Sequence, residues 1–463
     1  MGALQRELRH AAGAAAVALA ACGGAHTVPP PAPSPTARPP VAPLATACTV
    51  HGTTAPGPDT VFIAVERLAL SASASRQVYE PLVRVDCEGN PVPGLASRWH
   101  DDENGSVWTF ELEPGPTFMG GAPVDAEAVA ASLERALVHR GPGPQVRSLQ
   151  AIGDRSVVVR FDGPRMDAPR LLSDARFAIA GAPDQAGDRA GSGPYAWTAA
   201  PDSGGGVIIL RSRDPLAHQV LKLVALPAGA DLRDALERGI PAIGLPQIDV
   251  LVTRDAEVVA YVEHREDLRA FPLPWDLTYV LVAGAAQDGG ARRADLGSAD
   301  RAALARDAVR GDARGAEPPF WWRDDSTCVA IAPRTEPPRR EVGFRVDDPT
   351  ARELAERIVA LAASPNPPSW IPPVLAGGSG TSIRVAALPR DSVDDAVARG
   401  RVAAAVVAYP RAAPAACDDA PRRAPGAAAG ALVDSRAHVI VRRGVSLIMD
   451  GDGGIRFFSG QRP

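Results

Sequence analysis

Histidine and cysteine are scarce in this chain, with 8 histidines and 5 cysteines among 463 residues. The histidines are scattered without an H-x-x-x-H pair, and no two cysteines form C-x-x-C, so the usual ligand spacings of a zinc site are absent. The formal net charge of -5 provides no basic field for nucleic acid. Beyond the N-terminus, no stretch approaches the roughly 18 consecutive apolar residues of a membrane-spanning helix. We therefore expect no metal, no cofactor, no nucleic-acid partner and no membrane span.

Motifs that would mark an enzyme are also missing. The sequence GGSGT at 377–381 lacks the last glycine of a G-x-S-x-G nucleophile turn and lies in a Pro/Gly-rich loop. DGDGG at 450–454 has too few oxygen ligands for calcium, and its place between VSLIM and IRFF favours a hairpin turn. GSGPY leads into Tyr195 and Trp197, which indicate a strand rather than the helix N-terminus of an anion site. We expect a protein that is not an enzyme.

The first residues have the order of an export signal. Arg6 and Arg9 precede the apolar run AAGAAAVALA, and LAAC ends at Cys22. A cysteine after Leu-Ala-Ala resembles the bacterial lipoprotein signal, in which cleavage exposes the cysteine for acylation. We expect a signal peptide at 1–21 and a lipid on Cys22; the alternative is an uncleaved signal with an incidental cysteine. Residues 22–58 are rich in proline and alanine and are expected to form an extended tether.

Four cysteines follow the expected lipidation site, and they are Cys48, Cys87, Cys328 and Cys417. Export to an oxidising compartment permits disulfides, but the spacing does not choose among the three full pairings. Free buried thiols are an open alternative.

The folded body alternates strand and helix patterns. In VWTFEL, the large side chains of Trp108, Phe110 and Leu112 fall on one face of a strand, and Pro-Gly ends it. Asp125 is placed to cap a helix over 126–137, in which apolar residues recur every four positions. The segment is therefore a strand, a tight connection and a helix that folds back on a sheet.

Two later segments repeat one pattern of a short capped helix, a glycine and an apolar strand. They are DLRDALERG before IDVLV, and SVDDAVARG before VAAAVVAY. Between them, Pro349 marks the first turn of a third helix. These units predict an α/β fold.

Several stretches match motifs of one family. VYEPLVRVDCEGNPVPGLASRW and SVWTFELEPGPTFMGGAPVDAEAVAASLERAL follow its first motifs, GSGPYAW follows its glycine-threonine-glycine-proline-tyrosine turn, and ALERGIPAIGLPQIDVLV follows its leucine-x-x-glycine-x-x-aspartate segment. The chain thus resembles the family 5 extracellular solute-binding proteins, the oligopeptide-, dipeptide- and nickel-binding components of bacterial ABC importers. The resemblance rests on specific motifs from Asp59 to Val252, and beyond Val252 it is limited to the order of helix and strand patterns.

The resemblance implies a two-lobed, periplasmic-binding-protein-like α/β fold, in which crossing strands act as a hinge and the lobes close over a ligand. It implies one family domain at 59–463 and a compressed C-terminal lobe. The expected parts are lobe one at about 59–275 and about 436–463, an inserted scaffold domain at about 82–188, and lobe two at about 276–435.

The implied function is that of a lipid-anchored receptor in the periplasm or cell envelope. It would act as a monomer and deliver a peptide or another small solute to an ABC permease in the inner membrane. The alternative is a degenerate family member that serves as an envelope interaction or sensory lipoprotein without a role in transport.

Two departures from the family bear on the ligand. The family's tryptophan-x-alanine-aspartate-tyrosine segment aligns here through Tyr409, with Ala405 at the tryptophan and Ala408 at the aspartate. In peptide binders that aspartate pairs with the peptide's amino terminus. Burying an ammonium without a carboxylate partner is unfavourable by several kcal/mol. We therefore expect free peptide amines to bind weakly, and acylated peptides, acidic solutes or apolar compounds to be favoured.

The residues expected to line the ligand site are Trp275, Tyr279, Trp321, Trp322, Arg323 and Tyr409. Core or interface packing is the alternative for each aromatic side chain. Arg323 is placed to meet a carboxylate of the ligand.

The resemblance also bears on the cysteines. In the family's scaffold the end of the tether lies near the first hairpin, which favours a disulfide between Cys48 and Cys87. Cys328 and Cys417 then form the second candidate pair, for which free buried thiols are an equal alternative.

Overall fold

The computed structural model describes most of the chain from Cys48 onward. The described residues are 48–52, 58–65, 69–102, 104–138, 146–183, 189–198, 206–214, 219–227, 229–283, 296–318, 320, 339–376, 382–389, 392–411 and 428–457. The expected signal peptide and most of the tether fall outside them, as do Cys22, Trp321, Trp322, Arg323, Cys328 and Cys417. Within these ranges, no helix is long and apolar enough to cross a membrane.

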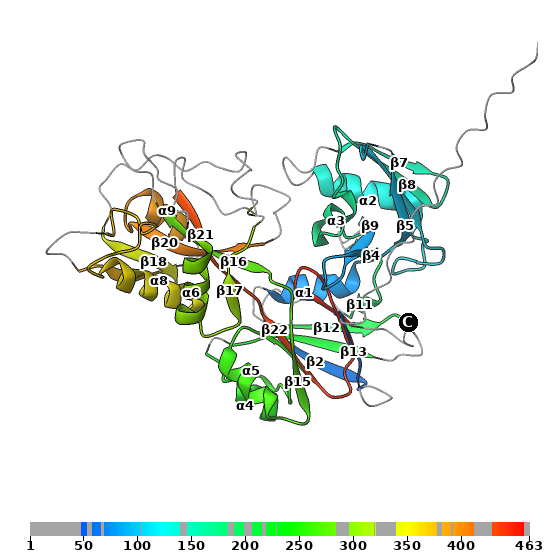
Figure 1. The fold of residues 1–463 in the computed structure, drawn as a ribbon. Coiled ribbons are helices and arrows are strands. Elements are labelled where there is room, and N and C mark those ends of the chain that lie inside the picture. The colour runs from blue at the N-terminus through cyan, green and yellow to red at the C-terminus, as the bar shows by residue number, and fades with distance from the viewer. Residues whose placement is uncertain are drawn as a thin grey trace, which may run out of the picture. The chain divides into compact units, whose positions relative to one another are not determined.

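A seven-stranded mixed sheet takes strands from both ends of the described chain (Figure 1). Strands β13, β2 and β14 are parallel neighbours, and the other pairings are antiparallel. Helix α1 (Leu70–Val78) packs on one face, and α4 (Leu232–Arg238) and α5 (Ala256–Glu263) pack on the other. In spatial order the strands are β11 (Tyr195–Trp197), β12 (Val207–Ser212), β13 (Val220–Ala225), β2 (Thr60–Val65), β14 (Val250–Thr253), β22 (His438–Arg442) and β15 (Leu268–Pro272).

A six-stranded sheet forms a second α/β layer structure. Helices α6 (Ser298–Ala308) and α8 (Pro349–Ala362) cover one face, and α9 (Val393–Ala398) packs on the other. In spatial order its strands are β17 (Ala313–Gly315), β21 (Ala428–Ser435), β16 (Leu277–Ala283), β20 (Ala404–Pro410), β18 (Glu341–Arg345) and β19 (Arg384–Leu388).

A four-stranded antiparallel sheet packs against helix α2 (Ala126–Val138) around a third core. Its strands in spatial order are β5 (Ala96–Asp101), β6 (Val107–Leu112), β8 (Ser156–Phe161) and β7 (Val146–Ile152). The remaining elements are β1 (Thr49–Val50), β3 (Val83–Val85), β4 (Pro91–Pro93), α3 (Ala168–Leu171), η3 (Ala175–Phe177), β9 (Ala180–Pro183), β10 (Arg189–Gly191), η4 (Pro241–Ile243), β23 (Leu447–Met449) and β24 (Ile455–Phe457).

The strand and helix predicted around residues 107–137 are both confirmed. Strand β6 alternates in burial, with Trp108, Phe110 and Leu112 directed into the core. The Oδ1 atom of Asp125 accepts a hydrogen bond of 2.9 Å from the backbone N–H of Ala128, which is the helix cap that the sequence predicts. This segment belongs to the four-stranded layer and contributes scaffold.

Both repeated helix–strand units are present, but their caps differ. Asp231 caps α4 through the backbone N–H groups of Arg233 and Asp234. The predicted cap of α9 is wrong: the side chain of Ser392 makes no capping hydrogen bond, and its hydroxyl donates to the carbonyl of Pro389 at 3.0 Å instead. The third predicted helix is α8, which begins at Pro349.

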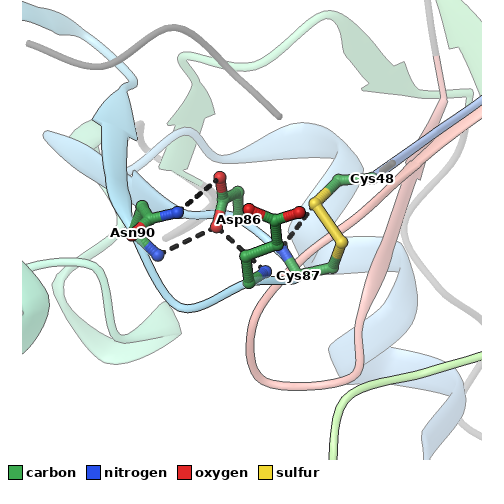
Figure 2. Close-up of a disulfide and its surroundings, with 5 residues drawn as sticks. Cys48, Asp86, Cys87 and Asn90 are labelled. Carbon is green, nitrogen blue, oxygen red and sulfur yellow. Dashed lines mark hydrogen bonds between the residues drawn. A yellow bond between two sulfur atoms is a disulfide. The ribbon is translucent and has the colours of Figure 1, made fainter. Parts of the chain in front are cut away.

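The disulfide favoured by the family resemblance is present between Cys48 and Cys87, with 5.3 Å between their Cα atoms. It joins the segment before β1 to the turn between β3 and β4 (Figure 2). Asp86, which is buried, holds this turn by accepting hydrogen bonds from the backbone N–H groups of Glu88 and Asn90 at 3.0 and 2.8 Å. The crosslink therefore fixes an ordered turn to the N-terminal end of the described body.

Removing this crosslink should lower the free energy of unfolding. The closed loop spans 39 positions, for which the chain-entropy estimate is roughly 3 to 4 kcal/mol. Urea denaturation of Cys87→Ser should show this loss against the oxidised wild type. Adding reductant should abolish the difference between the two proteins, and equal stability without reductant would contradict the assignment.

Candidate functional site

A cavity of about 950 Å³ is lined by residues from elements of both large sheets, within the compact unit 41–463. One wall comes from α1, the start of α5 and the turn between β23 and β24. The other comes from β16, β20 and the connection between β18 and α8. A volume of this size lies at the upper end of the range that small-molecule sites occupy.

The lining of this cavity is rich in charge, with four arginines and seven acidic residues. The arginines are Arg76, Arg254, Arg310 and Arg345, and the acidic residues are Asp255, Glu257, Asp276, Asp347, Asp348, Glu353 and Asp452. The formal surplus is therefore three negative charges. No group of three or more His, Cys, Asp or Glu side chains in the described part of the chain is arranged to hold a metal ion.

Arg76 brings positive charge to the first wall, where it is held by the β23–β24 turn. Its guanidinium donates to Asp450 Oδ2 at 2.8 Å and to Asp452 Oδ2 at 2.5 Å. A Cβ atom at Gly454 would lie 2.3 Å from the Arg76 Cζ atom, so this approach requires glycine. The DGDGG segment is thus a hairpin turn, as its sequence predicts, and it positions an arginine.

Asp348 and Tyr279 form the second wall. Asp348 caps α8 by accepting a hydrogen bond of 2.9 Å from the backbone N–H of Ala351 on its Oδ1 atom. The Tyr279 hydroxyl donates to the same oxygen at 3.1 Å. Burial raises the pKa of Tyr279, which keeps this hydroxyl protonated, and burial also raises the pKa of Asp348.

Ala408 lies directly beside this pair. On the six-stranded sheet it is the register partner of Tyr279, and both residues line the cavity. Ala405 points to the opposite face of β20 and is fully buried in another core cluster. Of the two alanines that depart from the family pattern, only Ala408 opens space in the cavity.

Two short segments, 273–276 and 436–437, connect the seven-stranded sheet to the six-stranded sheet. On the first, Asp276 forms an ion pair with Arg254, and its other oxygen, Oδ1, is buried without a hydrogen-bond partner. Burial raises the pKa of Asp276, and the Arg254 guanidinium opposes that shift. Asp276 therefore holds a poorly solvated charge at the edge of the cavity.

The connections are clamped on the side of the six-stranded sheet by Asp434, which is 0% exposed. Its Oδ1 atom accepts a hydrogen bond of 2.7 Å from the Thr278 hydroxyl on the neighbouring strand. Its Oδ2 atom forms ion pairs with Arg411 and, at 3.3 Å, with Arg314. One buried carboxylate thus joins the first residues of β16 to the last residues of β21.

A second hollow, of about 580 Å³, is lined by residues 117–121, 196–198 and 211–213. Of the sequence-predicted ligand residues that the structure describes, Trp275, Tyr279 and Tyr409, none lines it. The larger cavity, which adjoins both connections, is the better candidate for a solute site.

Comparison with known proteins shows which family and which proteins the sequence and fold are similar to. Residues 90–210 match the family model described as bacterial extracellular solute-binding proteins, family 5 Middle. Over this stretch the chain is similar to that family. Over 67 residues it is 42% identical to the nickel-binding periplasmic protein of Escherichia coli K12, and this match covers 14% of this chain and 13% of that protein. Over 111 residues it is 33% identical to the periplasmic oligopeptide-binding protein OppA of Salmonella typhimurium, and this match covers 23% of this chain and 20% of that protein.

The family's fold extends over most of the chain. The crystal structure of NikA from Staphylococcus aureus in complex with Ni(L-His)2 superposes with a TM-score of 0.60 at 12% sequence identity, covering 87% of this chain and 99% of that one. The fold is therefore the two-lobed α/β fold of periplasmic binding proteins. The sequence matches to the curated relatives span only 13 to 20% of those relatives' lengths. The homologues are solute-binding proteins and not enzymes.

The structure distributes the predicted ligand residues over different environments. Tyr279 lines the cavity. Trp275 lies between two guanidinium groups, with Arg314 and Arg436 at 4.7 and 4.5 Å from its ring centroid. Tyr409 is 1% exposed and packs in the core on the face opposite to Ala408. The other three predicted residues lie outside the described ranges.

Sequence reasoning did not select the charged residues of the cavity. Asp348 follows a simple signal, an aspartate before a proline at a helix start, which indicates a cap and says nothing about a ligand. Asp276 and Arg254 are 22 positions apart and meet only through the fold. Their roles become visible once the connection between the two sheets is known.

Truncating the buried carboxylate should destabilise the protein strongly. Asp434→Ala leaves Arg314 and Arg411 without their shared partner, and breaking a buried ion pair costs about 3 to 5 kcal/mol. Urea denaturation should show a loss of this size. Asp312→Ala is the matched control, since Asp312 and its partner Arg436 are 30% and 28% exposed and an exposed pair contributes about 1 kcal/mol or less. Equal losses in the two variants would contradict the assignment.

Proposed function

We propose that this protein is the lipid-anchored substrate-binding component of an ABC importer. It binds a small solute or a peptide outside the inner membrane and delivers it to a membrane permease, acting as a monomer. The observation that carries the proposal is the cavity of about 950 Å³ with walls from both large sheets. The match of residues 90–210 to the family 5 model supports it, and the similar proteins include ones named for nickel and oligopeptide binding.

The connections between the sheets support a closing motion as part of this function. Within the described residues, two short segments join the sheets, and binding proteins of this kind close by changing a few backbone angles in such segments. The Arg254–Asp276 ion pair and the stacking of Trp275 between arginines lie at these segments. Their charges keep the connections ordered while leaving the cavity open to a ligand.

The alternative role is that of an envelope interaction or sensory lipoprotein that has lost its transport ligand. The cavity favours solute binding, because Arg76, Arg254 and Arg345 are only 17%, 28% and 27% exposed and are held by specific ion pairs. Neighbouring genes for two permeases and two ATPases would favour transport.

The test of solute binding is a thermal-shift screen that combines amino acids, di- to pentapeptides, nickel–histidine complexes and small organic ions. At least one solute should raise the melting temperature of the wild type. Ala408→Trp and Ala72→Trp each put an indole on a different wall of the cavity and should abolish that shift.

Val346→Trp is the matched control for these variants, since Val346 is 68% exposed and does not line the cavity. It should keep the wild-type shift. The proposal fails when no solute shifts the wild type, or when the shift survives in both cavity variants.

The lipid anchor rests on the signal sequence that ends at Cys22. Wild-type protein grown with a labelled fatty acid should incorporate the label and sediment with membranes. Cys22→Ser should carry no label and should be either soluble or unprocessed. Labelled Cys22→Ser protein would rule out acylation at this residue.

A further inference from the structure

Asp348 is a half-buried carboxylate of the cavity whose two oxygens differ in bonding. Its Oδ1 atom accepts hydrogen bonds from Ala351 and Tyr279. Its Oδ2 atom accepts none from the described residues, and within those residues Asp348 forms no ion pair at 4.0 Å or less. A carboxylate that is partly withdrawn from water and has a free oxygen gains from a positively charged partner.

The arginines of the cavity do not supply that partner, because each is paired with another carboxylate. Arg76 binds Asp450 and Asp452. The other pairs are Arg254 with Asp276, Arg310 with Glu353, and Arg345 with Asp347. Each cavity arginine therefore has a carboxylate partner other than Asp348, and Asp348 has no ion pair of 4.0 Å or less within the described residues.

Ala408 leaves space in the cavity next to Tyr279, whose hydroxyl reaches Asp348. Tyr279 connects the two residues, since it is the register partner of Ala408 and donates its hydroxyl to Asp348. A carboxylate at position 408 would crowd the wall with a further negative charge. With alanine there, the negative charge of this wall comes from the start of α8 instead of from β20.

We propose that the solute carries a primary ammonium group and that Asp348 binds it, with the Oδ2 atom accepting a hydrogen bond from the ammonium beside Ala408. This inference rests on the proposed function and names the substrate class of the same site. An ammonium donates up to three hydrogen bonds, and such charge-assisted bonds are about twice as strong as neutral ones. The inference replaces the preference for acylated, acidic or apolar solutes that follows from Ala408 considered alone.

The electrostatics of the empty cavity agree with this assignment. Burial raises the pKa of Asp348, the neighbouring Asp347 adds to that rise, and Arg345 opposes it. Ionising this carboxylate is therefore less favourable than in water, and a bound cation offsets that cost. An anionic solute would instead meet the surplus of three negative charges.

The test uses titration calorimetry on the processed full chain with matched probes. Trialanine and cadaverine carry free amines, N-acetyl-trialanine and N,N'-diacetylcadaverine have lost them, and glutarate is the anionic probe. At least one free-amine probe should bind, and its acetylated counterpart should bind at least ten-fold more weakly. Glutarate should not bind.

Asp348→Asn should weaken binding of that free-amine probe at least ten-fold without lowering the melting temperature of the ligand-free protein. Asparagine caps helices as well as aspartate does, so the start of α8 is preserved. Asp231→Asn is the matched control, because Asp231 caps α4 outside the cavity. It should change affinity less than two-fold.

Three results would overturn the inference. The first is equal affinity for a free-amine probe and its acetylated counterpart. The second is binding of glutarate, or of another solute from the screen, when neither trialanine nor cadaverine binds. The third is unchanged affinity for the free-amine probe in Asp348→Asn. In each of these cases the cavity binds a solute and the proposed function survives. The proposed function fails separately when no solute of any charge binds the wild type.

Discussion

The buried carboxylate of Asp434 is the constraint on which the connection of the two large sheets depends. It is fully enclosed, and it gathers the Thr278 hydroxyl and two guanidinium groups at the point where β16 begins and β21 ends. A charge with no exposure is stable only while all these partners stay in place. The ends of the two connecting segments are therefore fixed on the six-stranded sheet, and bending is left to the few residues between the strands.

The cavity follows from this arrangement of the connections. Asp276 lies on one connecting segment and also lines the cavity, so that its ion pair with Arg254 serves both. On the opposite wall the fold leaves Asp348 partly withdrawn from water with an unused oxygen. A protein selected only for stability would gain from neutralising that residue, whereas a binding site gains from keeping it. The unused Oδ2 atom of Asp348 is the feature on which the proposed cation site rests.

Local structure could be predicted from the sequence where one pattern decides the outcome. The alternation of Trp108, Phe110 and Leu112 can be satisfied only by a strand with one buried face, and the structure has that strand. Asp125 before a helical stripe is an equally local signal, and it is confirmed. Ser392 shows the limit, because its hydroxyl had two acceptable partners nearby and bonded a carbonyl instead of capping α9.

The candidate site could be predicted only in part, because its chemistry depends on which face of a strand meets the cavity. Tyr279 and Tyr409 both looked suitable as aromatic ligand residues. On adjacent antiparallel strands, Tyr279 is opposite Ala408, so Tyr409 lies on the other face and fills the core. Trp275 owes its position to Arg314 and Arg436, which are far from it in sequence. Contacts between residues so far apart in the chain produce no local sequence pattern from which they could be predicted.

Hydrogen–deuterium exchange with a bound solute tests most directly the central claim that one ligand contacts walls from both sheets. The account predicts that a solute which raises the melting temperature protects backbone amides at 347–350 and at 452–454 in the same experiment, since both segments line the cavity. Protection confined to one of these segments, or located at 117–121 and 196–198 around the smaller hollow, would contradict it.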